Sequence, residues 1–310
     1  MSVVRTVFLG SGPFGVPSFR ELAAHPDIEL VGVVTVPPRP AGRGHVLRPT
    51  PIDDAARDLE VPAILRPPRL RDRAAIESVL ALRPAFAVLA DYGQLVPPAL
   101  LDLRHGALNL HPSLLPRHRG ASPIPAAILA GDAETGVTLM RMDDGLDTGP
   151  IVAAEPSPLD GTETAPDLEA RLAPLAADLL ARSIEPWLAG ALPAIPQPAS
   201  GATLTRPLRR EDGRLDAALP THALERRVRA YRPWPGTFLD TSVGRIAVWA
   251  AHVEPTLPGH EPGALVAHDD GLAFATVDGL LVLDEVQPAG GRPMTGAALR
   301  RGRPGLVRPS

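Results

Sequence analysis

The first half of the chain alternates short apolar runs with segments of helical periodicity, and this alternation restricts the possible folds more than any other feature. Such runs are typical of strands buried on both faces, and the helical segments between them are typical of crossover connections. The expected strands are Val4–Gly10, Ile28–Val36, Val61–Leu65, Phe86–Ala90, Gly106–Leu110, Val137–Met142 and Ile151–Ala154, and the expected helices are Phe14–Ala24, Ile52–Leu59, Asp72–Ala81, Ser122–Ala130 and Leu168–Ala189. We therefore predict an α/β domain with a Rossmann-like, doubly wound and mostly parallel sheet.

A stretch rich in proline and glycine follows the last of these helices. It predicts a linker at residues 191–206 between a first domain, 1–190, and a second, 207–310, because these residue types interrupt helices and strands. Residues 37–51 have a similar composition, and we expect no regular structure there. In the second domain the sequence predicts a small β-barrel. Its elements are a helix at Thr221–Ala230 and strands at Gly244–Ala250, Gly263–Val266, Leu272–Thr276 and Leu280–Val286.

The charge distribution permits a polyanionic partner without requiring one. All 31 basic side chains are arginines, and the net charge is −4. Residues 205–310 carry 14 arginines against 12 acidic residues, whereas the rest of the chain is acidic.

The absence of cysteine excludes disulfides, thiol nucleophiles and thiolate metal sites. No apolar run approaches the roughly 18 residues of a membrane-spanning helix, and we expect a cytoplasmic protein.

An asparagine and a histidine stand at the end of one expected strand, in Asn109-Leu110-His111-Pro112. Ligands of doubly wound sheets bind outside the carboxyl ends of the strands. Residues i and i+2 of a strand point the same way, so both side chains can face one reacting atom. An amide can donate to an oxyanion, and an imidazole can move a proton. The same residue types also form turns, and spacing alone leaves both interpretations open.

A carboxylate that can orient this histidine is Asp147, in Gly145-Leu146-Asp147-Thr148-Gly149. Beside His111 it would favour the imidazolium form. A serine hydrolase built on Ser113 is disfavoured, because Ser113 has no Gly-x-Ser-x-Gly elbow and stands two residues from its base. His105, His111 and His118 lack the spacing of a metal site, and we expect no metal.

Residues 10–15, Gly10-Ser11-Gly12-Pro13-Phe14-Gly15, match the dinucleotide fingerprint between an expected strand and helix. A dinucleotide site also needs an acidic residue at the end of the second strand, where Val34-Thr35-Val36 stands. A tight structural turn is therefore favoured over a nucleotide site.

Several long segments resemble the folate-dependent formyltransferases, and in particular those that act on initiator tRNA. They are Ser113-Leu114-Leu115-Pro116-Arg117-His118-Arg119-Gly120-Ala121-Ser122-Pro123-Ile124, residues 131–138, residues 142–149, Arg39-Pro40-Ala41-Gly42-Arg43-Gly44, Pro233-Trp234-Pro235-Gly236-Thr237 and Gln287-Pro288-Ala289-Gly290. The resemblance implies a Rossmann-like catalytic domain followed by a barrel similar to the oligonucleotide-binding fold. It also implies a monomer, without a membrane, that transfers the formyl group of 10-formyltetrahydrofolate to the α-amino group of methionyl initiator tRNA in translation initiation.

The resemblance also assigns roles to single residues. Asn109, His111 and Asp147 match the family's catalytic trio. The residues it implies for the folate are Ser113, Leu114, Leu115, Pro116, Tyr92, Gly93 and Leu95, and those it implies for the tRNA are Arg43, Arg206 and Arg209. The chain departs from the family pattern at His45, Val46 and Asp53, where basic residues are common, and at Asp91, where a small residue is usual.

Two other functions compete with this one. A formyltransferase acting on an amino-sugar nucleotide would share the trio and the folate site. A non-catalytic RNA-binding protein would use the barrel and its arginines, but it would have no need of Asn109, His111 and Asp147.

Overall fold

The computed structural model describes residues 3–41, 46–242, 244–255 and 260–307. By backbone proximity the chain forms two compact units. The first comprises Met1–Pro123, Glu134–Pro158 and Glu169–Thr205, and the second comprises Ile124–Ala133, Leu159–Leu168 and Arg206–Ser310. Within the described ranges, no helix is both long and apolar enough to cross a membrane.

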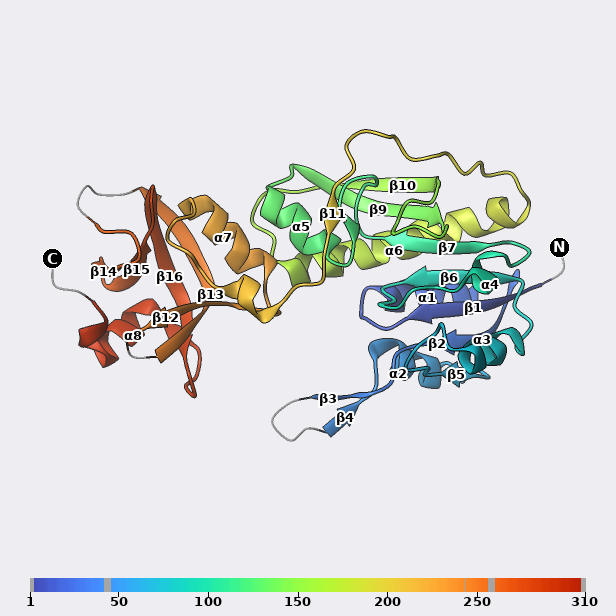
Figure 1. The fold of residues 1–310 in the computed structure, drawn as a ribbon, viewed down its shortest axis with the longest axis horizontal. Helices are drawn as coiled ribbons and strands as arrows, with labels where there is room; N and C mark the ends of the chain where they lie inside the picture. Colours follow the sequence, from blue (N-terminus) through green and yellow to red (C-terminus); the bar gives the residue numbers. More distant parts are fainter. Residues whose placement is uncertain (1–2, 42–45, 243, 256–259, 308–310) are drawn as a thin grey trace. The chain divides into compact units, whose positions relative to one another are not determined.

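A mixed, mostly parallel sheet forms the centre of the first unit (Figure 1). Its spatial order is β10 (Ile151–Pro158), β9 (Glu134–Arg141), β7 (Ala107–His111), β6 (Phe86–Ala90), β1 (Val4–Gly10), β2 (Ile28–Val34) and β5 (Ile64–Leu65). The strands from β7 to β5 run parallel, whereas β9 and β10 are antiparallel to their neighbours. The short connection between β9 and β10 makes that pair antiparallel, because a parallel pair needs a long crossover. The predicted Rossmann-like fold class is confirmed.

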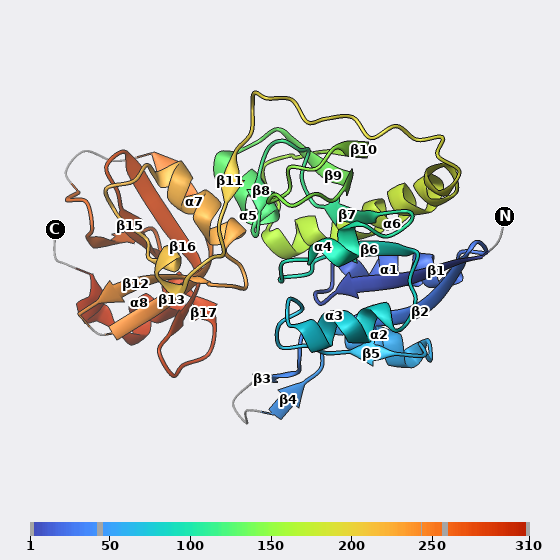
Figure 2. The ribbon, with the colours of Figure 1, turned by 45° about the vertical axis from the view of Figure 1, so that its right-hand side comes forward.

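Helices flank this sheet, as both views of the ribbon show (Figures 1 and 2). They are α1 (Gly15–Ala24), α2 (Pro51–Asp58), α3 (Arg73–Leu80), α4 (Pro98–Leu101) and most of α6 (Ala165–Leu188). Phe8 of β1 and Phe19 of α1 are fully buried, with ring centroids 5.2 Å apart. Apolar residues that alternate with helical crossovers thus produce a core on the sheet, as the sequence pattern predicts.

The segment 37–51 does contain regular structure, contrary to our expectation. β3 (Arg39–Ala41) and β4 (Val46–Arg48) form an antiparallel pair in which Pro40 lies opposite Leu47. Each strand of an isolated pair has a free edge, where the missing N–H of a proline is tolerated. His45, one departure from the family pattern, lies outside the described residues, and Val46 is exposed.

Two glycines of residues 10–15 are required by close packing. A Cβ on Gly10 would lie 2.7 Å from the Ala90 carbonyl oxygen, and one on Gly15 would lie 2.9 Å from the same main-chain oxygen. The Ser11 N–H donates to the Asp91 carbonyl oxygen at 3.0 Å. The turn between β1 and α1 therefore packs against the end of β6, and this packing accounts for the glycines without a bound dinucleotide.

The second unit contains an antiparallel sheet (Figure 1). Its order is β12 (Thr237–Thr241), β13 (Gly244–Pro255), β16 (Gly279–Pro288), β15 (Gly271–Ala275) and β14 (Leu265–His268), and β17 (Met294–Thr295) pairs with β16. Helices α7 (Thr221–Ala230) and α8 (Gly296–Gly302) pack on these strands, and α5 (Pro123–Ala130) belongs mainly to this unit. Leu224, Ile246 and Leu281 are among its fully buried residues. The antiparallel β domain is confirmed, and closure into a barrel stays a prediction.

Asp53 is buried in an ion-pair cluster. Its side chain is 0% exposed and accepts hydrogen bonds from Arg57 Nε at 2.7 Å and from Arg66 Nη2 at 2.8 Å, with a further bond from Arg66 Nε. The hydrogen bonds from Arg66 are the main reason that the pKa of Asp53 lies below its ordinary value. The carboxylate is therefore neutralised inside the unit, and this departure from the family pattern presents no negative charge to a partner.

We expect Asp53→Asn to lower the free energy of unfolding by about 3 kcal/mol at pH 7, because it breaks a buried ion pair. A group whose pKa is lowered by folding stabilises the folded state at pH values above its unfolded pKa. This stabilisation is lost as the pH falls through the pKa of the folded state. The difference from wild type should therefore shrink below about pH 4. Thermal and denaturant unfolding of both proteins, at pH 7 and again below about pH 4, measure this difference in the free energy of unfolding. Glu77→Ala, which breaks the exposed pair with Arg73, should cost less than about 1 kcal/mol, and equal losses in the two variants would contradict the prediction.

Candidate active site

Asn109 and His111 lie on β7 and point to the same face of the sheet, as their spacing predicts. β7 lies between β6 and β9, where Asn109 is opposite Leu89 and Met140. The Asn109 side chain is partly buried, and it makes no hydrogen bond to another residue that the structure describes. Since buried amides are normally paired, this one is free to bind a ligand.

The His111 ring is held between a carbonyl and a carboxylate. Its Nε2 lies 2.9 Å from the carbonyl oxygen of His118. A carbonyl only accepts, so Nε2 carries the proton and donates it. Nδ1 then has the free lone pair of the neutral ring, and it lies 3.7 Å from Asp147 Oδ2. The atom able to take a proton thus faces the carboxylate.

The protonation state of His111 differs from our expectation. Burial lowers the pKa of His111 below its ordinary value, and Asp147, which raises that pKa, only partly compensates. The residue is 4% exposed, so the charged ring loses most of its hydration. Asp147 acts in the predicted direction, but the expected imidazolium is wrong for the free protein, where His111 is neutral at pH 7.

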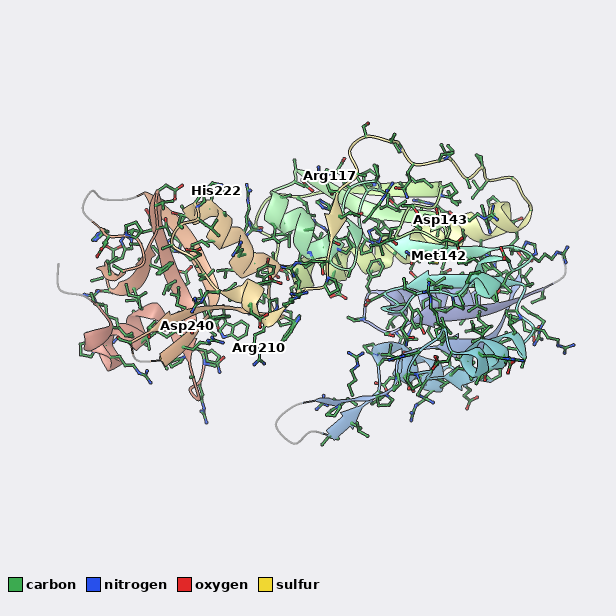
Figure 3. All side chains as sticks on the ribbon, viewed as in Figure 1. Arg117, Met142, Asp143, Arg210, His222 and Asp240 are labelled. Carbon is green, nitrogen blue, oxygen red and sulfur yellow. The ribbon has the colours of Figure 1, made fainter. Side chains whose placement is uncertain are left out.

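Asp147 reaches the histidine from the loop between β9 and β10. Its Oδ2 accepts a hydrogen bond of 2.7 Å from the Gly120 N–H, and its φ of 51° is one that L-residues rarely adopt. Asp143, labelled in Figure 3, is the second residue of this loop, and its carboxylate accepts from the Gly145 N–H at 3.0 Å and from the Thr148 hydroxyl at 2.8 Å. The loop is therefore constrained by its own hydrogen bonds, with the Asp147 carboxylate directed at His111.

The residues predicted to bind folate follow two neighbouring strands. Ser113–Pro116 comes after β7, and Tyr92, Gly93 and Leu95 come after the adjacent parallel strand β6. Both segments therefore start at the same sheet edge. Gly93 has no atom within 4 Å of the position of a Cβ, and Leu95 is 59% exposed, whereas the Tyr92 hydroxyl is buried without a hydrogen-bond partner. Open backbone and apolar surface suit a flat heterocycle, and the folate contacts stay a prediction.

Ser113 has a structural position. It is fully buried, and its hydroxyl donates to the Arg117 carbonyl oxygen at 2.7 Å. Its own carbonyl accepts from Thr138 Oγ1, which also accepts from the Leu115 N–H. This environment argues against the serine-hydrolase alternative, because the hydroxyl proton is directed away from His111. Among the described side chains no group of three or more His, Cys, Asp and Glu is placed to hold a metal ion.

The residues predicted to contact tRNA are described only in part. Arg43 lies outside the described residues. Arg206 is exposed and donates to both carboxylate oxygens of Asp212, at 2.8 and 2.5 Å. These hydrogen bonds are the main cause that lowers the pKa of Asp212 to about 2. The N–H of Arg209 donates to the same carboxylate, while its side chain is exposed. A phosphate would therefore compete with Asp212 for Arg206.

Sequence reasoning missed the main-chain groups that complete the site. The carbonyl of His118 fixes the tautomer of His111, and the N–H of Gly120 fixes the carboxylate of Asp147. Main-chain groups have no sequence signal of their own. Gln197 was also missed, because it lies in the stretch expected to be a linker, although its side chain contacts the Asp147 loop.

Comparison with known proteins identifies the family of the chain. A family profile described as "Formyl transferase" matches residues 4–184, and one described as "Formyl transferase, C-terminal domain" matches residues 207–304. The chain therefore belongs to the formyl transferase family, and it is a formyltransferase enzyme.

Curated relatives of the chain have a more specific name. A methionyl-tRNA formyltransferase of Roseiflexus castenholzii is 43% identical over 301 residues, which cover 96% of this chain and 96% of that protein. One of Halorhodospira halophila is 42% identical with the same coverage. Among solved structures, an N-formyltransferase of Helicobacter canadensis superposes with a TM-score of 0.67 at 14% identity and covers 91% of this chain and 98% of that one. That likeness shows the fold.

Proposed function

We propose that this chain transfers the formyl group of 10-formyltetrahydrofolate to the α-amino group of methionyl initiator tRNA in the cytoplasm. Relatives named methionyl-tRNA formyltransferase match it over nearly their whole length. The observation that carries the chemistry is the pairing of an unbonded amide, Asn109, with a neutral His111 whose Nδ1 faces Asp147. The first domain would catalyse the transfer, and the second would bind tRNA beyond the linker 191–206.

The mechanism uses the substrate amine as nucleophile. Its nitrogen attacks the formyl carbon and forms the new C–N bond, while the carbonyl oxygen becomes an oxyanion that the Asn109 amide stabilises. The proton released by the amine moves to Nδ1 of His111, and Asp147 stabilises the imidazolium that results. When the bond from the formyl carbon to the folate nitrogen breaks, His111 returns the proton to that nitrogen. Formyl-methionyl-tRNA and tetrahydrofolate leave, and His111 is neutral again.

An amino-sugar nucleotide is the alternative acceptor, and a solved structure of the same fold supports considering it. The Helicobacter canadensis enzyme of the same fold was crystallised with folinic acid and dTDP-3-aminofucose. The two chains are 14% identical over 91% of this one, so that their likeness extends to the fold. The much higher identity to the tRNA enzymes supports methionyl-tRNA.

An acceptor assay tests the proposal. The purified protein and 10-formyltetrahydrofolate are incubated with methionyl initiator tRNA, with methionyl elongator tRNA or with a dTDP-amino sugar, and formylated products are quantified by mass spectrometry. We expect product with initiator tRNA and at least about 100-fold lower kcat/KM with the other acceptors, a difference of about 2.7 kcal/mol in transition-state binding. Preferred formylation of the sugar nucleotide would replace the proposal by its alternative, and no formylation of any acceptor would overturn both.

A further inference from the structure

The Gln197 side chain makes four hydrogen bonds around the candidate active site, although it lies between two prolines. Its Nε2 donates to the carbonyl oxygens of Asp147 and Gly149, both at 2.8 Å. Its Oε1 accepts from Nε and Nη2 of Arg119 at 3.0 and 2.6 Å. The amide therefore uses both its donors and its acceptor. All the residues concerned belong to the first unit.

These bonds join the two segments that place the Asp147 carboxylate. Gln197 holds the main chain of Asp147 directly, in the left-handed conformation that L-residues rarely adopt. Through Arg119 it also holds the strand residue next to Gly120, whose N–H donates to Asp147 Oδ2. One side chain thus fixes both the loop that carries the carboxylate and the donor that orients it.

We infer that Gln197 is a positioning residue, which keeps the Asp147 carboxylate directed at His111 during formyl transfer. The inference rests on the proposed function for its kinetic consequence, and on geometry alone for its effect on His111. It gives the stretch 191–206 a part in the active site in addition to its predicted role as a linker.

Main-chain hydrogen bonds, rather than the Gln197 amide, attach residues 191–206 to the first unit. The main chains of Ile151 and Ile195 exchange two hydrogen bonds, of 2.7 and 2.8 Å. Further along, β11 (Leu204–Thr205) pairs with β8 (Arg119–Gly120), and the Arg119 N–H donates to the Thr203 carbonyl at 2.9 Å. Removing the Gln197 amide therefore leaves these attachments in place, and we expect its variants to fold.

Kinetics give the first test. Gln197→Ala should lower kcat about tenfold, with both KM values within about twofold of wild type, because a displaced catalytic group slows the chemical step. Gln197→Glu keeps an acceptor for Arg119 but loses the donors to Asp147 and Gly149, and its kcat should fall by the same factor. Gln287→Ala is the matched control, because its amide likewise joins a carbonyl, that of Gly291, to a donor, Trp249 Nε1. Wild-type kcat in Gln197→Glu, or an equal loss in Gln287→Ala, would overturn the inference.

A double substitution separates positioning from general loosening. If Gln197 acts through the carboxylate, Gln197→Ala should cost no more than about twofold in an Asp147→Asn background, since coupled residues are not additive. An undiminished tenfold loss in that background would show that Gln197 acts by another route.

A titration without substrate makes the test independent of the proposed function. His111 is followed by NMR against pH in wild type, Gln197→Ala, Asp147→Asn and Gln287→Ala. The charged or titratable groups that influence His111 are Asp147, which raises its pKa, and His118, which lowers it. Gln197→Ala should therefore shift the His111 titration to lower pH, as Asp147→Asn does, and Gln287→Ala should not. An unmoved titration in Gln197→Ala would overturn the inference even if formyl transfer is confirmed, and a shifted one would uphold the positioning role even if the acceptor is another amine.

Discussion

Replacing His111 with alanine is expected to lower kcat for formyl transfer about 10³-fold, within the range typical of a positioned general base. The neutral ring carries its proton on Nε2, bound to the His118 carbonyl, so that Nδ1 is the atom that can accept the amine proton. Alanine removes this acceptor and also the cation that forms beside the oxyanion. Single-turnover formylation with saturating donor and acceptor measures the chemical step directly.

The pH dependence of wild-type kcat/KM tests which protonation state of His111 is active. Burial holds the pKa of His111 below its ordinary value, and the base must be neutral to act. Once the values are corrected for protonation of the acceptor amine, whose ordinary pKa is about 8, activity should therefore be constant around pH 7 and decline only on the acid side of about pH 6.5. A loss of activity as the pH rises through 7 would indicate instead that His111 works as a preformed imidazolium. His105→Ala is the matched control, because His105 lies in the same unit and its ring has no role in the proposed mechanism; kcat should stay within about twofold of wild type.

The sheet and one half of the site could be predicted from local pattern. Apolar runs separated by helical segments define parallel strands, and the carboxyl end of such a strand is where ligands bind. Asn109 and His111 could be paired because alternate residues of a strand share a face. These conclusions depend on periods of a few residues, which a single sequence shows directly.

The position of Asp147 depends on longer-range geometry. β9 runs antiparallel to β7, and its last residue, Arg141, lies opposite Leu108 near the start of β7. The loop that follows must turn back along β7 before its carboxylate can reach His111 at the other end. The hydrogen bonds of Asp143, Gly120 and Gln197 hold that return. Nothing in the local pattern of residues 142–150 specifies which distant groups would do this.

The charge of His111 was mispredicted for a related reason. A neighbouring carboxylate is visible in a family motif, but the depth at which the ring is buried depends on how the segments around β7 pack. Desolvation and the carboxylate act in opposite directions on the same pKa, and here desolvation is larger. Likewise, the sequence shows that Asp53 stands where the family usually has a basic residue, but it does not show that Arg57 and Arg66 neutralise the buried carboxylate.

Asn109 offers the second large effect, and Asn109→Ala should lower kcat about 10²- to 10³-fold, the usual cost of removing one oxyanion donor. The amide makes no hydrogen bond to the described residues, so that alanine breaks no internal contact, and the free energy of unfolding should change by less than about 1 kcal/mol. Asn109→Ala should thus lower activity without lowering stability, whereas Asp53→Asn should lower stability. Asn109→Asp keeps the shape but replaces the donor by a negative charge beside the developing oxyanion, and it should be at least as slow as Asn109→Ala.

Asn109 is the only asparagine in the sequence, which allows its amide to be observed alone. Protein labelled with ¹⁵N in the asparagine side chain should give a single pair of amide proton resonances. Because the oxyanion exists only in the short-lived tetrahedral adduct and the transition states beside it, a stable tetrahedral analogue of this adduct should shift this pair far more than tetrahydrofolate, which has no formyl oxygen. Equal shifts with the two ligands, together with wild-type kcat in Asn109→Ala, would remove Asn109 from the mechanism and leave the stabilisation of the oxyanion to His111 alone.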